Sequence, residues 1–399
     1  MPRGAVTVNE LRMHADTLAY GGDAVGRLAS GKVCFASGGL PGEELELRVV
    51  QEKSAFARAE VVKVLTRAPE RIEVDCPAFT ENKCPGCAYI FCDYRCELEW
   101  KNRQFSDFLC RSGLMEHGEL LEPFSTGERF GYRNKLKLHS DGKGNFGMVG
   151  RDNETIFPVK ECLLARAEIN AAIAGTPVPE AGCCVTWRYS SADGKVTAFR
   201  DGAKLKNCNW LTEEIPGFGK FKVPQDGFFQ TNINVAAELV RRVVGTVAAS
   251  GAEQMVELYC GVGVFSIAAA GKIPHLKVTA TEIVPGAIKA ARWNAGKHGV
   301  GERCTFFAGD AGKLSAAQKA APGALVLVDP PRGGLSRQTI EAIVAMKPVK
   351  VIYVSCAPDT LRRDLLIFQK SGWCVEHAGM LDMFPGTAHF ESMVTLKKI

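Results

Sequence analysis

Short stretches in which apolar and polar residues alternate dominate residues 5–66. GKVCFA, EELELRVV and RAEVVKVL alternate in this way, and turn-forming clusters such as SGGLPGE separate them. Alternation with a period of two is typical of β-strands that bury one face. We expect about five short strands here, which fits a small OB-like barrel, although another small β-domain would show a similar pattern.

From residue 225 onward the pattern changes to helices alternating with buried strands. Apolar residues recur at helical spacing at Val235, Leu239, Val243 and Val247, and this pattern ends at Gly251. Strand-like apolar runs follow, each trailed by a helix or loop: MVELY, KVTAT, CTFFA, ALVLV and KVIYV. The alternation predicts an α/β doubly wound parallel sheet, and the last runs, WCVEHAGML and HFESMVTLKKI, predict an antiparallel finish.

The segment between these regions is mixed. It begins with a cysteine cluster, continues with a predicted helix, ELEWKNRQFSDFLCRSG, and then contains β-like runs such as GYRNKLKLHS and VTWRYSS. The chain is therefore expected to have three domains. These are a β-barrel over 1–68, a mixed α+β central domain over 69–224, and a Rossmann-like α/β domain over 225–399.

Composition and charge narrow the class of protein. The 399 residues are 46% hydrophobic and 23% charged, which is ordinary for a globular protein. The net charge of +5 is too small for a protein that coats nucleic acid, but 225–399 carries 19 basic and 14 acidic side chains, which suits a polyanionic substrate.

No segment has the pattern of a signal peptide, and no apolar run approaches the roughly 20 residues that span a bilayer. We expect a cytoplasmic protein with no membrane partner. In that reducing compartment, the fifteen cysteines are expected to be metal ligands, catalytic groups or buried side chains rather than disulfides.

The segment MVELYCGVGVFSIAAA has the order strand, glycine turn, helix. Gly261 and Gly263 would let the backbone approach a ligand closely, and Glu282 at the end of the next strand could accept hydrogen bonds from both hydroxyls of a ribose. These features fit either a dinucleotide or S-adenosylmethionine. The third glycine of GxGxxG is absent and no second feature indicates a pyrophosphate, so the methyl donor fits better.

Three polar residues are predicted to meet at the carboxyl edge of the sheet. Asp329 follows the strand ALVLV, Cys356 follows KVIYV, and Glu391 opens the last strand. The helix predicted after Cys356 should lower the thiol pKa through its dipole. Methylation of pyrimidine carbon 5 requires a thiolate, a base and a group that orients the ring. Taken singly, Asp329 could be a cap residue and Cys356 a buried strand-end side chain.

Basic and aromatic residues are interleaved in RFGYRNKLK, which contains no acid. Basic groups such as Arg133 and Lys135 can follow a phosphate backbone, and aromatic rings can stack on unpaired bases. The alternative is a solvated strand face.

The cysteine cluster has metal-ligand spacing. Cys76, Cys84 and Cys87 form C-x7-C-x2-C, while Cys92 and Cys96 are close enough to compete as ligands. Four thiolates can hold either zinc or an iron–sulfur cluster, and the spacing does not choose between them.

Several motifs together resemble the bacterial RNA uracil-5-methyltransferase family, and most closely its 23S ribosomal RNA members with an iron–sulfur cluster. They are YGGDAVGR, LPGE, the cysteine cluster, GYRNK, FFQTN, LYCGVG, DPPRGG, YVSCAP and DMFPGTAHFESM, and they span nearly the whole chain. The resemblance implies an N-terminal TRAM barrel, a central domain and a class I methyltransferase domain.

The same resemblance implies roles for particular residues. Cys356 would be the nucleophile and Glu391 the proton acceptor. The positions that would line the donor or uracil pocket are Gln230, Tyr259, Glu282, Asp310 and Asp329. The ligands of a four-iron four-sulfur cluster would be Cys76, Cys84, Cys87 and Cys162.

We therefore expect a monomeric S-adenosylmethionine-dependent enzyme that methylates carbon 5 of a uridine in RNA, with ribosomal RNA favoured over transfer RNA. An RNA cytosine-5-methyltransferase needs the same thiol chemistry. A non-catalytic, cluster-bearing RNA-binding protein is an alternative of another class, although a binder would need neither Cys356 nor Glu391.

Overall fold

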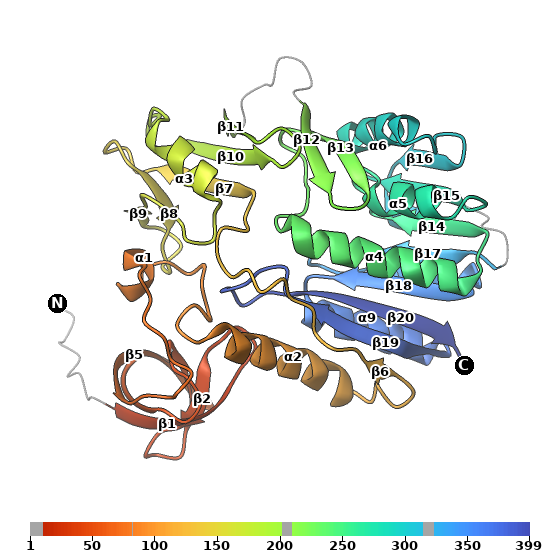
Figure 1. Ribbon diagram of the computed structural model, residues 1–399. Coiled ribbons are helices and arrows are strands. Elements are labelled where there is room, and N and C mark those ends of the chain that lie inside the picture. Colours follow the sequence, from red (N-terminus) through yellow and green to blue (C-terminus); the bar gives the residue numbers. More distant parts are fainter. Residues whose placement is uncertain (1–10, 82, 202–209, 314–322) are drawn as a thin grey trace. The chain divides into compact units, whose positions relative to one another are not determined.

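The computed structural model describes residues 11–81, 83–201, 210–313 and 323–399 (Figure 1). The chain divides into two compact units. The first comprises the chain up to Gln104 together with Gly150–Thr155 and Pro385–Ala388, and the second comprises Phe105–Val149, Ile156–Phe384 and His389–Ile399. No helix among these described residues is long and apolar enough to cross a membrane.

The first unit contains a closed five-stranded barrel, as the alternating pattern predicted. Its strands are β1 (Leu11–Leu18), β2 (Ala24–Arg27), β3 (Val33–Ser37), β4 (Glu44–Glu52) and β5 (Phe56–Thr66), in the order β1-β2-β3-β5-β4. The inward-facing side chains are small or aliphatic, including Ala15, Ala36 and Leu47, and they form the barrel core. Helix α1 (Pro77–Thr80) follows the barrel, and α2 (Tyr94–Cys110) is the helix predicted before Gly113.

A buried ion pair links the loop before β4 to the segment after β5. Glu43 has no exposed surface, and its carboxylate accepts hydrogen bonds from the backbone N–H groups of Leu40 and Ala68. The Arg71 guanidinium donates to both oxygens of the same carboxylate, at 2.5 and 2.7 Å. The two backbone N–H groups and the bidentate guanidinium hold this carboxylate on both oxygens, which is the arrangement that a buried charge requires.

The second unit carries the remaining sheets. One has the order β11-β10-β7-β8-β9, with strands Lys195–Arg200, Cys184–Ser190, Lys135–Ser140, Phe146–Val149 and Ile156–Pro158. Helix α3 (Ala167–Ala174) packs on it around the buried Trp187. Strands β12 (Trp210–Ile215) and β13 (Gly219–Pro224) form an antiparallel pair that comes directly before helix α4 in the chain.

An eight-stranded sheet dominates the rest of this unit, in the order β16-β15-β14-β17-β18-β20-β19-β6. Its strands, in chain order from β6 and then β14 to β20, are Glu119–Leu120, Gln254–Leu258, Lys277–Glu282, Cys304–Ala308, Leu325–Val328, Lys350–Ser355, Trp373–Leu381 and Glu391–Lys398. Strands β14 to β18 are parallel, and β20 is antiparallel to both neighbours, as predicted. The short edge strand β6 had no sequence signal.

Helices cover both faces of this sheet. Helices α4 (Ile233–Ser250), α5 (Val264–Lys272) and α6 (Pro285–Lys297) share one core with Leu327 and Val354 of the sheet (Figure 1). Tyr353, whose side chain points to the opposite face, donates a hydrogen bond to Asp364 of α9 (Pro358–Lys370), which follows α8 (Arg337–Ala345). The fold is the doubly wound α/β architecture that the sequence predicted.

Replacing Glu43 by alanine should destabilise the first unit by about 3–5 kcal/mol, because the largely buried Arg71 guanidinium would lose its carboxylate partner. Its neighbour Glu44 is a matched control, since it pairs only with the exposed His14. Glu44→Ala should change stability by less than about 1 kcal/mol. Urea unfolding of both variants, followed by circular dichroism, measures the difference. Equal effects would contradict the structural role assigned to the Glu43–Arg71 pair.

Candidate active site

The loop after β14 has the backbone of a ligand-binding turn. Tyr259 has a φ of 67°, Gly261 a φ of 53° and Gly263, which precedes α5, a φ of 85°. A Cβ on Gly261 would meet nothing within 4 Å, so open space lies directly against this backbone. A Cβ on Gly263 would instead press on Ile267, Phe306 and Ala291 at 3.1 to 3.2 Å. Gly261 therefore faces the site, whereas Gly263 allows the helix to pack closely.

Glu282 fixes the neighbouring strand end to this loop. One of its carboxylate oxygens accepts a hydrogen bond from the Gly261 N–H at 3.2 Å, and the other accepts from the Val284 N–H at 2.9 Å. The carboxylate therefore lies beside the glycine turn, where it could also accept hydroxyl groups of a ribose, as predicted from sequence.

A mostly apolar cavity of about 50 Å³ opens next to the same loop. Gln230, Tyr259, Gly261 and Asp329 all line it, so the structure gathers four of the residues predicted for the cofactor. Phe228, which is 72% exposed, also lines the cavity and had not been singled out in the sequence. Asp310 lies instead beyond β16, where its carboxylate accepts hydrogen bonds from the Gly312 and Lys313 N–H groups.

Asp329 lies at the point where the strand order reverses. In the sheet, β15 and then β16 lie on one side of β14, whereas β17 and then β18 lie on its other side. In open α/β sheets, ligands bind outside the carboxyl ends of the strands at such a point. The Asp329 N–H donates to the Leu258 carbonyl at 3.4 Å, which joins the two strand ends.

The ladder between β18 and β20 places Cys356 beside Glu391. Ser355 pairs with Ser392, and the Ser392 hydroxyl donates to the Ser355 carbonyl at 3.0 Å. The next pair of residues toward the carboxyl ends of the parallel strands is Cys356, directly after β18, and Glu391, the first residue of β20. The Glu391 side chain is 4% exposed, and its Oε1 has no hydrogen-bond partner among the described residues. An unsatisfied buried carboxyl oxygen is a feature of functional sites rather than of stable cores.

Burial and neighbouring carboxylates raise the pKa values of two acidic groups at this edge. Burial, followed by the Glu282 carboxylate, raises the pKa of Asp329 to about 7. Burial and then Asp329 raise the pKa of Glu391 well above its usual range. The nearby Arg332 guanidinium acts in the opposite direction on Glu391. Protonation of at least one of these carboxyl groups at neutral pH therefore relieves the repulsion between them.

The prediction that the helix dipole lowers the thiol pKa of Cys356 was wrong. Burial, followed by the Glu391 and Asp329 carboxylates, raises this pKa to about 11, and Arg332 opposes the rise only in part. The sequence predicted the helix start and both acids near the thiol, but it did not show how deeply the thiol is buried, and burial is the largest cause of the shift. Cys356 is therefore held mainly as the thiol at neutral pH.

Two residues missed by sequence reasoning shape the loop after Asp329. Asp364 of α9 accepts hydrogen bonds from the Leu335 N–H and the Tyr353 hydroxyl, both at 2.7 Å. Arg363 donates to the carbonyls of Gly333 and Leu335. The RRD sequence in α9 was visible, but nothing in its spacing indicated that it supports the DPPRGG loop.

A buried acid beneath the glycine loop was also missed. Glu257 of β14 has no exposed surface, and one of its carboxyl oxygens is hydrogen-bonded to the Ser266 hydroxyl of α5. Burial raises its pKa to about 8, so it is largely neutral at physiological pH. The bond connects β14 to α5 across the loop that carries Gly261.

The predicted RNA-contacting residues lie on and before β7. Lys135 is half-buried in β7, and burial together with the Arg188 charge lowers its pKa. Arg133 is fixed through its backbone, donating its N–H to Leu164 and accepting from Arg166. The structure places neither side chain with Cys356 or Glu391, so their contact with RNA stays a prediction.

The predicted metal ligands fall in different compact units. Cys76, Cys84 and Cys87 belong to the first unit, around α1, whereas Cys162 belongs to the second. Across the described ranges, no group of three or more His, Cys, Asp or Glu side chains is arranged to hold a metal ion. The competing thiols interact with each other, since a hydrogen bond from Cys92 lowers the pKa of Cys96. The described residues do not fit a ready-made cluster site.

The sheet order, the glycine loop at the end of β14 and the acid at the end of β15 define a class I methyltransferase fold. A family model described as tRNA (Uracil-5-)-methyltransferase matches residues 218–317 and 319–399, and a TRAM domain model matches residues 6–62. The chain belongs to the RNA uracil-5-methyltransferase family, and it is an S-adenosylmethionine-dependent enzyme.

Relatives match over almost the whole chain. The 23S rRNA (uracil(1939)-C(5))-methyltransferase RlmD of Vibrio parahaemolyticus is 30% identical, covering 99% of this chain and 96% of that protein. RlmD of Chromohalobacter salexigens is 28% identical, covering 96% and 88%. The solved tRNA (uracil-54, C5)-methyltransferase of Pyrococcus abyssi has the same fold, with a TM-score of 0.74 and 22% identity over 96% of this chain and all of that one.

The raised pKa of about 11 makes alkylation of Cys356 strongly pH-dependent. Between about pH 7 and pH 9 the rate with iodoacetamide should rise about tenfold per pH unit, because only the thiolate reacts and its fraction grows in that proportion below the pKa. Glu391→Gln removes a carboxylate that raises the thiol pKa, so it should increase the rate several-fold at a fixed pH. Mass spectrometry of peptide digests measures both rates.

The exposed Cys110 provides the internal comparison in the same digests, because it lies outside the site. Its rate should not respond to Glu391→Gln. A Cys356 rate that is already maximal near neutral pH would show that the thiol is ionised there, contrary to its burial beside two acids.

Proposed function

We propose that this enzyme transfers a methyl group to carbon 5 of a uridine in 23S ribosomal RNA through a covalent bond between Cys356 and the uracil ring. The observation that carries the proposal is the β18–β20 register, which sets a thiol and an unsatisfied buried carboxyl group side by side at the edge of a methyltransferase sheet. A fold of this class needs neither group to bind a methyl donor, so their presence together points to covalent chemistry.

Cys356 acts as the nucleophile. Its thiolate adds to carbon 6 of the uracil, forming a C–S bond and moving the ring electrons onto carbon 5 and the carbonyl oxygen, so that carbon 5 becomes nucleophilic. S-adenosylmethionine, when bound, supplies the methyl group that carbon 5 takes up. Arg332 favours the thiolate, because its positive charge lowers the pKa of Cys356.

Glu391 acts as the base. After methylation, carbon 5 still carries its proton, and the ionised Glu391 carboxyl removes it while the C–S bond breaks and Cys356 leaves as thiolate. The high pKa of Glu391 makes it a stronger base than an exposed carboxylate. The same burial holds it without competing hydrogen bonds on Oε1.

Asp329 orients the ring. Its pKa of about 7 makes both protonation states accessible near neutral pH, so the carboxyl group can accept from the uracil N3–H or donate to a carbonyl oxygen. The cavity that joins Asp329 to Gln230 and Tyr259 is where the donor would approach the ring.

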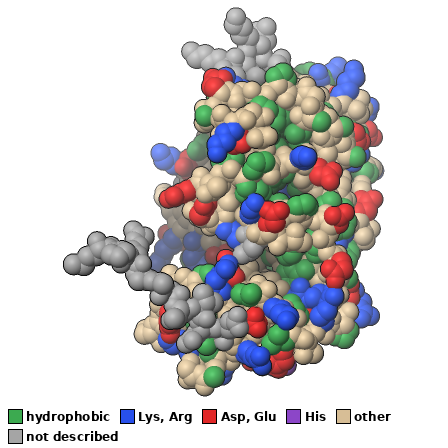
Figure 2. All heavy atoms as spheres, turned by 90° about the vertical axis from the view of Figure 1, so that its left-hand side faces the viewer, with side chains coloured by type: hydrophobic (Ala, Val, Ile, Leu, Met, Phe, Trp, Pro, Cys, Tyr) green, Lys and Arg blue, Asp and Glu red, His purple; other side chains and the backbone are tan. Residues whose placement is uncertain are grey.

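Ribosomal RNA is proposed as the substrate because the relatives that match over nearly the full length include two named as 23S rRNA enzymes. A transfer RNA uridine is the alternative, since the family model and the Pyrococcus abyssi protein carry that name. Figure 2 shows Lys and Arg side chains mixed with Asp and Glu on the visible face, without a continuous basic surface. The charge on this face gives no basis for choosing between the two RNAs.

RNA containing 5-fluorouridine should trap the enzyme in the presence of S-adenosylmethionine, because fluorine cannot leave carbon 5 as a proton does. A denaturation-stable adduct should form with 23S rRNA, be absent in Cys356→Ala and persist in Cys374→Ala, a half-buried thiol on β19 that lies outside the site. On ordinary RNA, Glu391→Gln should slow turnover by at least about 100-fold and accumulate a methylated adduct. Denaturing gels and mass spectrometry detect both species.

The outcome also separates the alternatives. An adduct on transfer RNA alone would identify transfer RNA as the substrate. 5-Methylcytidine in nucleoside digests would identify cytosine as the methylated base. RNA binding without any adduct or methyl transfer would support the alternative of a non-catalytic RNA-binding protein. Mapping the adduct by primer extension would identify the nucleotide.

A four-iron four-sulfur cluster on Cys76, Cys84, Cys87 and Cys162 is proposed on the cysteine spacing and the resemblance alone. Protein purified without oxygen should be brown and contain about four iron and four sulfide per chain. Cys87→Ser should lose the iron, whereas Cys110→Ser, on the exposed end of α2, should retain it. Stoichiometric zinc without colour would replace the cluster by a zinc site, and a metal-free, folded protein would rule out both.

A further inference from the structure

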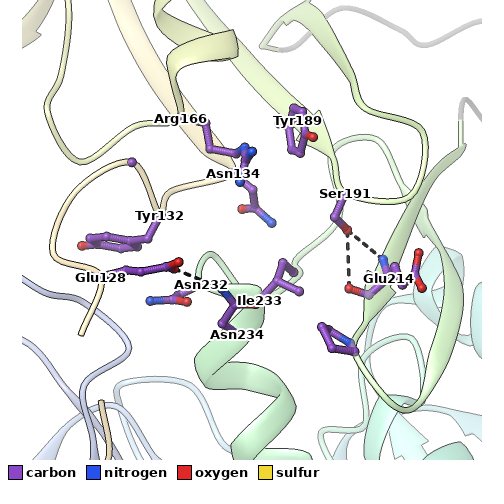
Figure 3. Close-up of a pocket in the computed structure, with 12 residues that line it drawn as sticks. Glu128, Tyr132, Asn134, Arg166, Tyr189, Ser191, Glu214, Asn232, Ile233 and Asn234 are labelled. Carbon is purple, nitrogen blue, oxygen red and sulfur yellow. Dashed lines mark hydrogen bonds between the residues drawn. The ribbon is translucent and has the colours of Figure 1, made fainter. Parts of the chain in front are cut away.

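A second cavity, of about 240 Å³, lies in the second unit and is separate from the reacting groups (Figure 3). Its lining comes from the loop before β7, from Arg166 at the start of α3, from β10 and the turn after it, from β12 and Pro216 after it, and from the start of α4. None of the predicted catalytic or cofactor residues lines it, so the mechanism above leaves this cavity without a role.

Asn232 contributes a buried hydrogen-bond donor without a partner. Its Oδ1 accepts from the Val235 N–H at 3.3 Å and so caps α4, which fixes the other amide atom as nitrogen. The residue is 1% exposed, and its Nδ2 has no hydrogen-bond partner in the part of the chain that the structure describes. A buried amide donor left in this state loses free energy unless a ligand supplies an acceptor.

Aromatic side chains contribute flat walls. The Arg166 guanidinium lies over the Tyr189 ring at 4.2 Å from its centroid, and Tyr132 lines another side of the cavity. Stacked guanidinium and aromatic planes are the surfaces on which unpaired RNA bases stack. Arg166 is the single cationic residue of the lining, beside Glu128 and Glu214, so the cavity suits a base better than a phosphate group.

Polar groups surround the amide of Asn232. The Glu128 carboxylate accepts from the Asn234 Nδ2 at 3.1 Å, and it lies beside Asn232 in Figure 3. A nucleobase edge carries both donors and acceptors, and this part of the cavity offers a carboxylate acceptor and an amide donor next to each other.

This cavity adjoins the donor cavity through one short segment. Gln230 lines the donor cavity, whereas Asn232, Ile233 and Asn234 line the second one. Asn134, also in the second lining, donates its Nδ2 to the Gln230 carbonyl at 3.0 Å. The two cavities are therefore neighbours along one short segment, and we expect a nucleotide in the second cavity to be close in sequence to a uridine at Cys356.

We propose that this cavity, built on Asn232, Tyr189 and Arg166, binds a second unpaired nucleobase of the RNA substrate, close in sequence to the methylated uridine. The base stacks against the aromatic wall and gives an acceptor to the Asn232 Nδ2. This inference rests on the proposed function for the kind of ligand, but the cavity acts in recognition and takes no part in the chemistry.

Asn232→Asp tests the donor without removing the helix cap, because a carboxylate oxygen still accepts from the Val235 N–H. Tyr189→Ala tests the stacking wall. Each should weaken RNA binding by about tenfold or more, while the affinity for S-adenosylmethionine and the melting temperature stay close to those of the wild type. Asn145→Asp, in the exposed turn between β7 and β8, is the matched control and should bind RNA normally.

A double cycle identifies the nucleotide. Once a 5-fluorouridine adduct has been mapped, short RNAs with one abasic position each are titrated against the full-length wild type and Tyr189→Ala. One abasic position should weaken wild-type binding and have little further effect in the variant. If every abasic position affects both proteins equally, or if Asn232→Asp binds RNA like the wild type, the proposal is wrong.

Failure of the proposed function would be visible separately. If no adduct forms, the same variants are titrated with a random-sequence single-stranded RNA pool, and a selective loss of binding in both would still support the cavity as a base site. Tight binding of free AMP, CMP, GMP or UMP that is lost in Asn232→Asp without any change in RNA binding would assign the cavity to a free nucleotide instead.

Discussion

The backbone ladder between β18 and β20 is the constraint on which the site depends. It fixes which residues face each other at the sheet edge, and therefore brings a thiol next to a carboxyl group from the last strand of the chain. A slip of one residue would send the Glu391 side chain to the other face of the sheet. The rest of the domain supports this pairing: β17 sets Asp329 beside it, and α9 holds the loop after Asp329 through Asp364 and Arg363.

Burial gives this edge its chemical character. The same loss of water that raises the pKa of Glu391 and Asp329 also raises that of Cys356, so the shifts of the proposed base and the proposed nucleophile have one main cause. A thiol with a raised pKa is largely protonated at neutral pH and therefore reacts slowly with small electrophiles. The positive charge of Arg332, on the loop that carries Asp329, lowers the pKa values of both Cys356 and Glu391 and so opposes part of the rise.

Much of this was readable from the sequence, because hydrophobic periodicity determines element type and parallel-strand topology determines where strand ends meet. The positions of Asp329, Cys356 and Glu391 followed from those two rules. The sequence did not show how deeply individual side chains are buried. The direction of the Cys356 pKa shift, the neutral state of Glu257 and the unpaired amide nitrogen of Asn232 all depend on packing in three dimensions. The cysteine spacing suggested ligands, but four thiols in two units do not make a site by spacing alone.

The segment Phe229–Asn234 gives residues to two cavities at once. A ligand that contacts this stretch from one cavity would share it with a ligand in the other cavity. Any coupling between the two would be reciprocal, because whatever factor one ligand adds to the affinity of the other is returned in the opposite direction. Such coupling would pass through a short piece of backbone within one chain.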